Sequence, residues 1–514
     1  MIKRYGVIYI GSNKCELVVG QRGKGGVNIL DRAMYPIDLG SQTFARGKID
    51  YASVIALSKI INDYLAVAKS SDVSEIDIVG TSALREARNR AYVLEQLRIF
   101  TGGHVVRLLT REEEVALGLR YMVFTGGPGI IDEKTDNLLS VISSGNITMA
   151  VAEKGKIVNL HHSDMGYLKM RELFRSVEES STHYETLLSD YIAIRSRVIA
   201  ESIGGRSIER LTIASHDVDV VAGLCGIPAG EDGCYHVPKK AFSTLRDDVE
   251  GLGVRQIMKK YPRLNHFQAE TLRHTLLLYL RLMKEAHAPE LTLIGMNIGD
   301  ALMNFKFNVT RDRELQEWIE ESAYLSVQSL ARKFHTDTNH TKMVEVLANR
   351  LFNALKGKYQ MKNEDAWVMS LAAQLLDIGQ FVGESDQGAM ARDLISRSDI
   401  IGLGAAEKRV IGSIVYGVRQ FPYEMSVFDG VLSPEESLRV SKLVAILKLA
   451  QTLDKSRKQK ISKLRCHLDE KEFVVTATTG KNIQLEKYFF QLNRDALKKV
   501  FGLEAKLRIK RTSL

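Results

Sequence analysis

Residues 4–21 read RYGVIYIGSNKCELVVGQ. Two apolar segments, Tyr5–Ile10 and Cys15–Gln21, flank a polar turn that contains Gly11. Each segment has the length and the β-branched content of a strand, and the glycine permits a tight connection between them. The pattern therefore predicts a β-hairpin, and Val27–Met34 continues it as a third strand after a further glycine-rich turn.

Helices and strands alternate after this start. Ala52–Lys69 has the apolar spacing of a helix, and short strands are expected at Ile76–Val79 and Val105–Leu108, each followed by a helix. A similar series of strands begins at Leu138, after the glycine-rich linker candidate at residues 125–129. This order is typical of an α/β fold and suggests two related lobes. Ligands of such folds usually bind in a cleft between the lobes.

The character of the sequence changes near residue 310, where helical patterns replace strands. Helices are expected at Glu314–Phe334, Thr341–Lys356, Asp365–Ile378, Ala389–Ser396, Ala405–Tyr416 and Pro434–Asp454. The last segments, Glu472–Thr478, Asn482–Glu486 and Leu503–Lys510, suggest a small β-containing cap. We therefore expect four parts: a lobe at 1–125, a second lobe at 126–308, a helical domain at 309–457 and an α+β cap at 458–514.

Composition narrows the class of protein. The net charge of +9 and the pI of about 9.1 favour polyanionic partners. The densest basic cluster, Lys455–Lys460, is typical of a solvated face, with polyanion contact as the alternative. Four widely spaced cysteines suit reduced thiols rather than a metal site or a disulfide framework. No apolar run reaches the ~20 residues that span a bilayer, and no signal sequence is evident, so a cytoplasmic protein without membrane partners is expected.

Several motifs resemble those of the exopolyphosphatase/guanosine pentaphosphatase (Ppx/GppA) family. Ile8–Asn13 resembles the first phosphate turn of that family, Ile-Asp-Ile-Gly-Ser-Asn, and Gly80–Asn89 resembles its Thr-Ser-Ala-Leu-Arg-(Asp/Glu)-Ala-x-Asn stretch. Leu109–Glu114 is similar to the Gly-x-Glu-Glu-Ala segment that supplies the catalytic glutamate. Further matches lie at Asp164–Phe174, Leu371–Gly379 and Leu449–Arg457. Because they extend over nearly the whole length, the chain is identified as a divergent member of this family.

The resemblance implies two actin-like (ribonuclease H-like) lobes, followed by an all-α HD-like domain and a small β-containing C-terminal cap. It implies a substrate of linked phosphates, either polyphosphate or guanosine tetra- or pentaphosphate. The implied reaction is the removal of a terminal phosphate by water, with a glutamate as base and Mg²⁺ as cofactor. It also implies a homodimer, and no specific nucleic-acid partner.

Candidate site residues follow from these matches. Glu113 is the preferred catalytic base and Glu114 the alternative. Thr110 and Glu113 also have the spacing of a capping box, which requires no chemistry. The resemblance implies that phosphate is bound by Gly11, Ser12, Asn13, Arg85 and Gly145.

The metal-binding positions depart from the family pattern. Tyr9 stands where the family has an aspartate, and a phenol is neutral at pH 7 and a poor Mg²⁺ ligand. Ser143 stands near the second expected aspartate, in a segment that also suits a plain hairpin turn. Asp217 is a possible substitute ligand, but no convincing metal ligand remains.

The HD-like pattern is also incomplete. Leu376 occupies the position of the histidine before Asp377. His335 and His340 lie upstream, near the first expected histidine, and the pair His340 and Asp377 is the remnant of the pattern. A structural domain without metal is therefore expected here.

Two classes of function stay open. The first is a phosphoanhydride hydrolase that uses Glu113, and the second is a binding or regulatory protein that keeps the cleft and loses the chemistry. The missing carboxylates favour the second. A sugar-kinase-type ATPase is a weaker alternative, because such enzymes depend on the same carboxylates and glycine turns.

Overall fold

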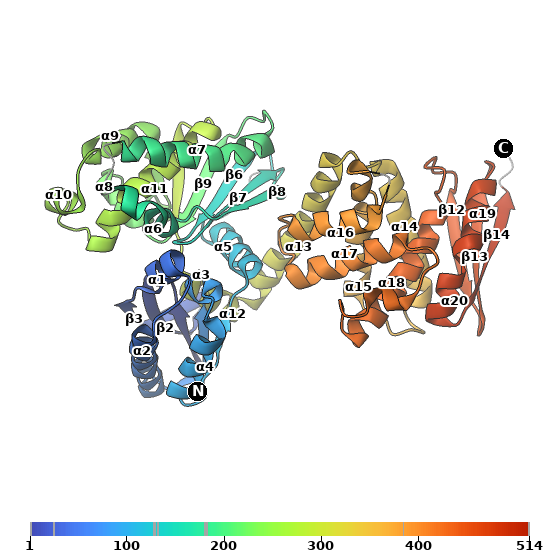
Figure 1. Cartoon of the computed structure of the whole chain (residues 1–514), viewed down its shortest axis with the longest axis horizontal. Coiled ribbons are helices and arrows are strands. Elements are labelled where there is room, and N and C mark those ends of the chain that lie inside the picture. The colour runs from blue at the N-terminus through green and yellow to red at the C-terminus, as the bar shows by residue number, and fades with distance from the viewer. Residues whose placement is uncertain are drawn as a thin grey trace. The chain divides into compact units, whose positions relative to one another are not determined.

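The computed structural model describes residues 3–23, 26–126, 130, 133–178, 183–383 and 385–511. It divides into two compact units, Met1–Ala323 and Tyr324–Leu514 (Figure 1). Residues 127–129 of the expected linker lie outside the described residues.

The first lobe of the first unit is built on a five-stranded sheet with the order β3-β2-β1-β4-β5. The predicted hairpin and third strand are confirmed, since β1, β2 and β3 pair in antiparallel fashion and β4 and β5 add in parallel. The strands are β1 (Arg4–Ile10), β2 (Lys14–Gly23), β3 (Gly26–Pro36), β4 (Val73–Gly80) and β5 (Val106–Leu108). The helices are α1 (Leu39–Arg46), α2 (Tyr51–Ser70), α3 (Ser82–Glu86), α4 (Arg90–Phe100) and α5 (Arg111–Gly126).

Both faces of this sheet are covered, which explains why its central strand is apolar throughout. Ile8 and Ile10 belong to one buried cluster together with Leu57 of α2, while Val7 belongs to another together with Met303. Met303 lies on α12 (Ile298–Phe307), which packs against β1, β2 and β3. This helix falls within the range expected for the second lobe, yet it completes the core of the first.

Within the described residues, α2 has the length and apolar composition of a membrane-crossing helix, judged by those two criteria only. Its apolar residues, such as Leu57 and Ile61, are buried in the first lobe, whereas Lys59 and Asp63 are exposed. The helix is thus accounted for by the core of this lobe.

The second lobe repeats the topology of the first. Its sheet has the order β10-β11-β9-β6-β7-β8, in which β6, β7 and β8 form an antiparallel series and β9 and β11 are parallel to β6. The strands are β6 (Asn137–Ile142), β7 (Ile147–Glu153), β8 (Lys156–Ser163), β9 (Arg210–Ser215), β10 (Tyr235–Pro238) and β11 (Glu290–Gly295). The helices are α6 (Tyr167–Glu178), α7 (Tyr184–Ile203), α8 (Val218–Leu224), α9 (Lys239–Val249), α10 (Val254–Lys260) and α11 (His266–Glu285). The two related lobes predicted from the strand repeat are therefore present.

The second unit is a helical domain that carries a small sheet. Its helices are the end of α13 (Val309–Lys333), α14 (Thr338–Leu355), α15 (Asn363–Gln374), α16 (Gln387–Arg397), α17 (Ala405–Arg419) and α18 (Pro434–Thr452), with short 3₁₀ turns η2 (Ile378–Phe381) and η3 (Met425–Phe428). The cap contains β12 (Lys463–Leu468), β13 (Glu472–Thr479), α19 (Gln484–Asn493), α20 (Asp495–Phe501) and β14 (Glu504–Arg511). The segment Asn482–Glu486, expected as part of a β-containing cap, instead leads into helix α19.

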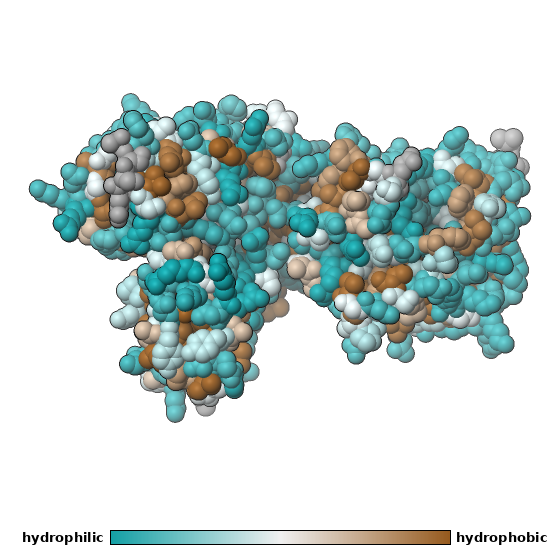
Figure 2. Space-filling model, in the orientation of Figure 1, coloured by the Kyte–Doolittle hydropathy of each residue, from teal (hydrophilic) through white to brown (hydrophobic). Residues whose placement is uncertain are grey.

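The polarity of the surface and the state of the cysteines are as the composition predicts. Figure 2 shows a mostly hydrophilic face on both units, with apolar residues in small scattered groups. All four cysteines are free thiols, as predicted, and Cys15 and Cys234 are buried.

Candidate functional site

The two strand-connecting turns that resemble phosphate turns occupy equivalent positions in the two lobes. The carbonyl of Ser12 accepts hydrogen bonds from the first two amides of α1, Leu39 N at 3.1 Å and Gly40 N at 2.8 Å. The carbonyl of Ser144 likewise accepts from Leu168 N at 3.0 Å and Lys169 N at 3.1 Å, at the start of α6. In each lobe the turn is thus fixed to a helix N-terminus, whose amides otherwise lack partners.

The turn of the second lobe lies in contact with the first lobe. A Cβ atom added to Gly145 would lie 2.9 Å from Phe44 Cζ and 3.2 Å from Ser82 Oγ. A Cβ atom on Gly166, which precedes α6, would lie 2.3 Å from the Ser144 carbonyl oxygen. Glycine is required at Gly166 because the backbone there approaches the turn too closely for any side chain. The turn of the second lobe therefore packs against α1 and α3 of the first lobe.

The residues of the first turn are mostly engaged in holding its shape. Gly11 N donates to Lys14 O at 2.9 Å, and Asn13 O accepts from Ile37 N at 3.0 Å. Ser12 is buried, with its hydroxyl 3.3 Å from that of Ser82 on α3. The turn therefore offers hydroxyl groups to the cleft, and its Gly11 amide is already used.

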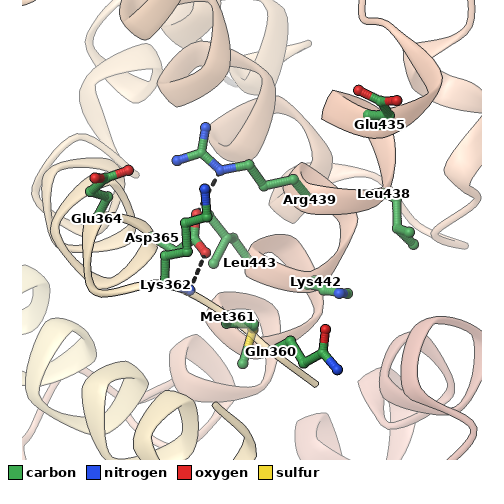
Figure 3. Close-up of a pocket in the computed structure, with 10 residues that line it drawn as sticks. All are labelled: Gln360, Met361, Lys362, Glu364, Asp365, Glu435, Leu438, Arg439, Lys442 and Leu443. Atoms are coloured by element: carbon green, nitrogen blue, oxygen red, sulfur yellow. Dashed lines mark hydrogen bonds and ion pairs between the residues drawn. The ribbon is translucent and has the colours of Figure 1, made fainter. Parts of the chain in front are cut away.

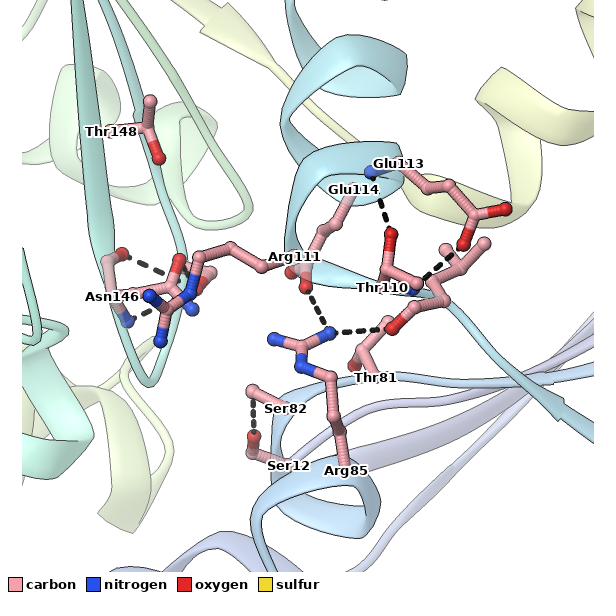
Figure 4. Close-up of polar contacts among 12 residues, drawn as sticks. Ser12, Thr81, Ser82, Arg85, Thr110, Arg111, Glu113, Glu114, Asn146 and Thr148 are labelled. Carbon is pink, nitrogen blue, oxygen red and sulfur yellow. Dashed lines mark hydrogen bonds and ion pairs between the residues drawn. The ribbon is translucent and has the colours of Figure 1, made fainter. Parts of the chain in front are cut away.

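Arg85 and Glu114 form the charged centre of the site (Figure 4). Arg85 Nη1 donates to Leu109 O at 2.8 Å and to Glu114 Oε2 at 3.0 Å. Glu114 is only 6% exposed, and burial raises the pKa of its carboxyl while Arg85 opposes that shift. The sequence matches place both residues at the site, and α3 and α5 bring them into contact.

Glu113, the preferred base, faces away from this centre. Its carboxylate accepts from Thr110 N at 2.7 Å, and Thr110 Oγ1 accepts from Glu113 N at 3.2 Å, which completes the capping box of α5. Its side chain is 49% exposed and pairs with Arg107 at 3.2 Å. The geometry therefore favours the capping role for Glu113 and gives the cleft position to Glu114.

Two buried donors in the cleft remain without a partner among the described residues, Arg85 Nη2 and Asn146 Nδ2. Asn146 lies on the Ser143–Asn146 turn, where Ser143 N donates to Asn146 O at 2.9 Å and confirms the predicted hairpin turn. Buried donors are rarely left unpaired, because the desolvation they suffer is not offset. Arg85 and Asn146 thus mark places where an acceptor would be stabilised.

The residues at the expected metal positions do not fit Mg²⁺, which prefers carboxylate oxygens and water. Tyr9 is buried, which raises the pKa of its phenol, and it stacks on His216 with ring centroids 6.3 Å apart. The Ser143 hydroxyl is hydrogen-bonded to Asn146 Oδ1 at 3.1 Å. Asp217 accepts from Gln268 Nε2 at 3.4 Å, and burial raises the pKa of its carboxyl. Within the ranges that the structure describes, no three His, Cys, Asp or Glu residues gather as a metal site.

The HD-like remnant in the second unit is a set of buried ion pairs. His340 Nδ1 lies 2.9 Å from Asp454 Oδ2, and both side chains are at most 2% exposed. Asp377 does not meet His340; it pairs with Arg419 and, at 2.6 Å, with Arg457. Leu376, at the missing histidine position, is buried in the hydrophobic core. The basic cluster at Lys455–Lys460 therefore supplies a structural partner through Arg457.

Two other cavities are less suited to a polyanion. One of about 290 Å³ in the second unit is crossed by the Arg439–Asp365 ion pair of 2.6 Å (Figure 3). Its three basic side chains face three acidic ones: Lys362, Arg439 and Lys442 against Glu364, Asp365 and Glu435. The other, of about 520 Å³ in the second lobe, has more glutamates than arginines: Glu178, Glu185 and Glu250 against Arg273.

Arg111, Asn146 and Arg419 are the residues of these sites that the sequence matches did not single out. Arg111 and Asn146 both lie within segments that the motifs had identified. For Arg111, a charged residue at the start of a helix and beside a candidate glutamate was a signal in the sequence that could have pointed to the site. Arg419 is 42 residues from Asp377, and no local pattern links the two.

Comparisons with known proteins agree with this architecture. A family model described as Ppx/GppA phosphatase, domain III, matches residues 324–498, which start where the second unit starts. Guanosine-5'-triphosphate,3'-diphosphate pyrophosphatase of Aliivibrio fischeri is 20% identical over 510 residues, which cover 95% of this chain and 96% of that protein. Exopolyphosphatase 1 of Mycobacterium tuberculosis is 31% identical over 111 residues, 21% of this chain and 32% of that protein.

A solved structure shows the same fold. An exopolyphosphatase from Cytophaga hutchinsonii superposes with a TM-score of 0.51 at 14% identity, and the match covers 59% of this chain and 97% of that one. The solved structure, the family model and the relatives agree with one another. The second unit matches domain III of the Ppx/GppA phosphatases, and the chain as a whole is similar to Ppx/GppA proteins and shares their fold of two actin-like lobes followed by a helical domain.

Proposed function

We propose that this chain binds linked phosphates, such as polyphosphate or guanosine pentaphosphate, in the cleft of the first unit, and that it hydrolyses them weakly or not at all. The observation that carries the proposal is the state of Arg85. Its guanidinium is fixed by Leu109 O and Glu114, and its buried Nη2 makes no hydrogen bond to the described residues. A fixed guanidinium with a spare donor is well suited to a phosphate oxygen.

The expected loss of hydrolysis follows from the donor set. Phosphoanhydride hydrolysis requires charge compensation on the phosphate oxygens and a positioned water. Tyr9 and Ser143 provide no carboxylate for a metal ion. The loss of one such stabilising group typically lowers a rate by roughly 10²- to 10³-fold, so two losses together leave little turnover.

A residual hydrolase is the second candidate, and Glu114 is the observation that favours it. A glutamate whose pKa is raised by burial is a better base near neutral pH than an exposed one. Glu114 lies at the centre of the cleft, whereas Glu113 is committed to the helix cap. If any turnover exists, we expect it to depend on Glu114.

Ligand access requires the lobes to separate. The Gly145 turn lies against Phe44 and Ser82, so that the space between the turns is filled in the closed form. Arg171 also bridges the lobes, since its Nη2 donates to Ser41 Oγ at 2.7 Å. Two-lobed folds commonly close around a ligand in this way.

The test measures binding and phosphate release in the same samples, with the full chain and either medium-chain polyphosphate or guanosine pentaphosphate. We expect saturable binding that Arg85→Met weakens roughly 10- to 100-fold, as for the loss of a charged hydrogen bond. Arg107→Met, which removes an exposed arginine of the same lobe, is the matched control. We expect no release above that of Glu114→Gln.

The outcomes separate the candidates. Release that disappears in Glu114→Gln while Glu113→Gln retains it would establish the hydrolase. Equal binding by the native chain, Arg85→Met and Arg107→Met would exclude the cleft as the binding site. A preference for one of the two ligands would identify the substrate class.

A further inference from the structure

A second arginine, Arg111, lies near the charged centre that Arg85 and Glu114 form. Arg111 is the first residue of α5, and Figure 4 shows its side chain extending towards the turn that carries Asn146. Its position is also evident at His162, whose pKa is lowered to about 3, first by burial and next by the charge of Arg111. Arg85 adds to the same effect. The fields of two guanidinium groups therefore overlap beside the turn.

Arg111 is the more easily redirected of the two. Among the described residues it pairs with Asp164 at a long separation of 3.9 Å, and both side chains are more than 40% exposed. Asp164 keeps another partner if Arg111 moves, because Lys169 Nζ lies 3.2 Å from Asp164 and 2.8 Å from Glu86. Redirecting Arg111 to a bound anion thus leaves Asp164 with Lys169 as a partner, which it shares with Glu86.

We propose that Arg111, together with Arg85, supplies the positive charge that a divalent cation would otherwise bring to the phosphates, so that the cleft binds a metal-free polyanion. This inference rests on the proposed function. A terminal phosphate carries charge and oxygens enough for two guanidinium groups, and the forked geometry of arginine matches them. Asn146 Nδ2 offers a further donor from the turn. Arg85 is also paired with Glu114, so it contributes mainly its spare Nη2 donor, whereas Arg111 contributes a charge that is paired only at 3.9 Å.

The donor set of the cleft supports this choice over a metal ion. The groups at the metal positions, Tyr9 and Ser143, are a buried phenol and an engaged hydroxyl. Hard cations are held by carboxylates, whereas these groups and two arginines favour an anion. Arginine stays charged at every physiological pH, so the charge of such a site does not depend on metal supply.

The experiment measures the affinity of the full chain for fluorescently labelled medium-chain polyphosphate in EDTA and in excess Mg²⁺. We expect binding in EDTA at least as tight as in Mg²⁺, because Mg²⁺ competes for the phosphates. Arg111→Gln should weaken binding in EDTA roughly 10- to 100-fold. It should also reduce the dependence of affinity on salt concentration, which reports the number of charge contacts. Arg111→Lys should retain most of the affinity, and Arg107→Gln is the matched control.

Each outcome decides between the two proposals. Binding that is absent in EDTA and restored by Mg²⁺ would overturn the inference and leave the proposed function standing. Equal affinities for the native chain and Arg111→Gln in EDTA would also overturn it. No binding under either condition would refute the proposed function together with the inference. Circular dichroism and the tryptophan fluorescence of each variant show whether the fold is retained.

Discussion

The cleft of the first unit and the HD-like remnant of the second depart from the family pattern in opposite ways. At this site the expected carboxylates are replaced by Tyr9 and Ser143, while Arg85 pairs with Glu114 and Arg111 extends towards the turn that carries Asn146. In the helical unit Asp377 and Asp454 are both present, and what is missing is a histidine, replaced by a buried leucine. The first change removes negative charge and the second removes a neutral metal ligand.

The difference shows how each site stays stable. Buried carboxylates that lose their metal require another cation or donor, since an unpaired buried charge is costly. In the helical unit arginines pair with Asp377, and His340 pairs with Asp454. In the cleft the remaining donors are basic and amide groups, for which a bound anion is the natural partner. One site has become structural, and the other is suited to polyanion binding.

The largest effect is expected from Asp454→Asn in the structural site. Asp454 Oδ2 accepts from Gln459 Nε2 at 3.1 Å and lies beside His340, while Oδ1 accepts from Gln459 N at 2.8 Å. Each hydrogen bond to a charged group typically contributes about 1.5–3 kcal/mol, and the buried Asp454 carboxylate takes part in three. We therefore expect the free energy of unfolding of the second unit to fall by that order. Urea denaturation followed by fluorescence of Trp367, in a Trp318→Phe background, measures it.

The exposed pair His467–Asp469, also 3.0 Å apart in the second unit, provides the matched control. Asp469→Asn should change the free energy of unfolding by well under 1 kcal/mol. If Asp454→Asn lowered the free energy of unfolding no more than Asp469→Asn does, the buried contact between Asp454 and His340 would not stabilise the second unit.

A smaller loss is expected in the first unit from Gly166→Ala. The added Cβ would lie 2.3 Å from both Gly145 C and Ser144 O, so the backbone of the closed turn must shift. Overpacking of this kind typically costs about 1–3 kcal/mol. We expect the Trp318 transition to move to lower urea while the Trp367 transition stays. Gly223→Ala, where nothing lies within 4 Å of the added Cβ, should leave both transitions in place.

In the second lobe we expect an effect of intermediate size on the free energy of unfolding when the pH is lowered. His274 is fully buried next to the Tyr184 hydroxyl at 2.7 Å, and burial lowers its pKa to about 3. Below about pH 6.5 this histidine therefore takes up a proton in the unfolded chain and not in the folded one. The free energy of unfolding decreases as the pH is lowered through that range. At pH 5.5 the loss is about 1.4 kcal/mol for this one group.

Comparison of His274→Gln with the native chain at pH 7.5 and 5.5 measures this effect, with Trp318 as the reporter. The variant should lose about 1.4 kcal/mol less than the native chain between the two pH values. An identical pH dependence in both proteins would show that His274 does not remain neutral in the folded state.

The smallest effect separates the two adjacent glutamates. Glu113→Gln weakens the capping box and the exposed pair with Arg107, and it should cost about 1 kcal/mol or less, with polyphosphate affinity unchanged. Glu114→Gln removes a negative charge next to Arg85 and should increase the affinity. Binding titrations of both variants check this contrast. If only Glu113→Gln lost affinity for polyphosphate, Glu113 would have to take part in binding.

Local patterns in the sequence were sufficient for most of the fold. The apolar run Tyr5–Ile10 and the helical segment Pro434–Asp454 both correspond to elements in the structure, a strand and a helix that are largely buried. The placement of α12 could not be predicted, since it returns to the first sheet from about 280 residues away. Long-range packing of that kind leaves no local signal.

The site was predicted less well than the fold. Adjacent residues on a helix point about 100° apart, so the choice between Glu113 and Glu114 depends on the phase of α5. That phase is set by the Thr110 cap and by the packing of α5, which the motif does not encode. The role of Arg85 depended on a residue 29 positions away. Motifs identified the segments, and tertiary geometry decided which side chains meet.

The contact of the Gly145 turn with Phe44 and Ser82 has a kinetic consequence. A polyanion can reach Arg85 only while the lobes are apart, so its apparent affinity is reduced by the fraction of time that they are. At high ligand concentration the observed association rate should level off at the rate of lobe opening. The same closure should slow dissociation, so a bound chain of phosphates would be held longer than its equilibrium affinity alone suggests.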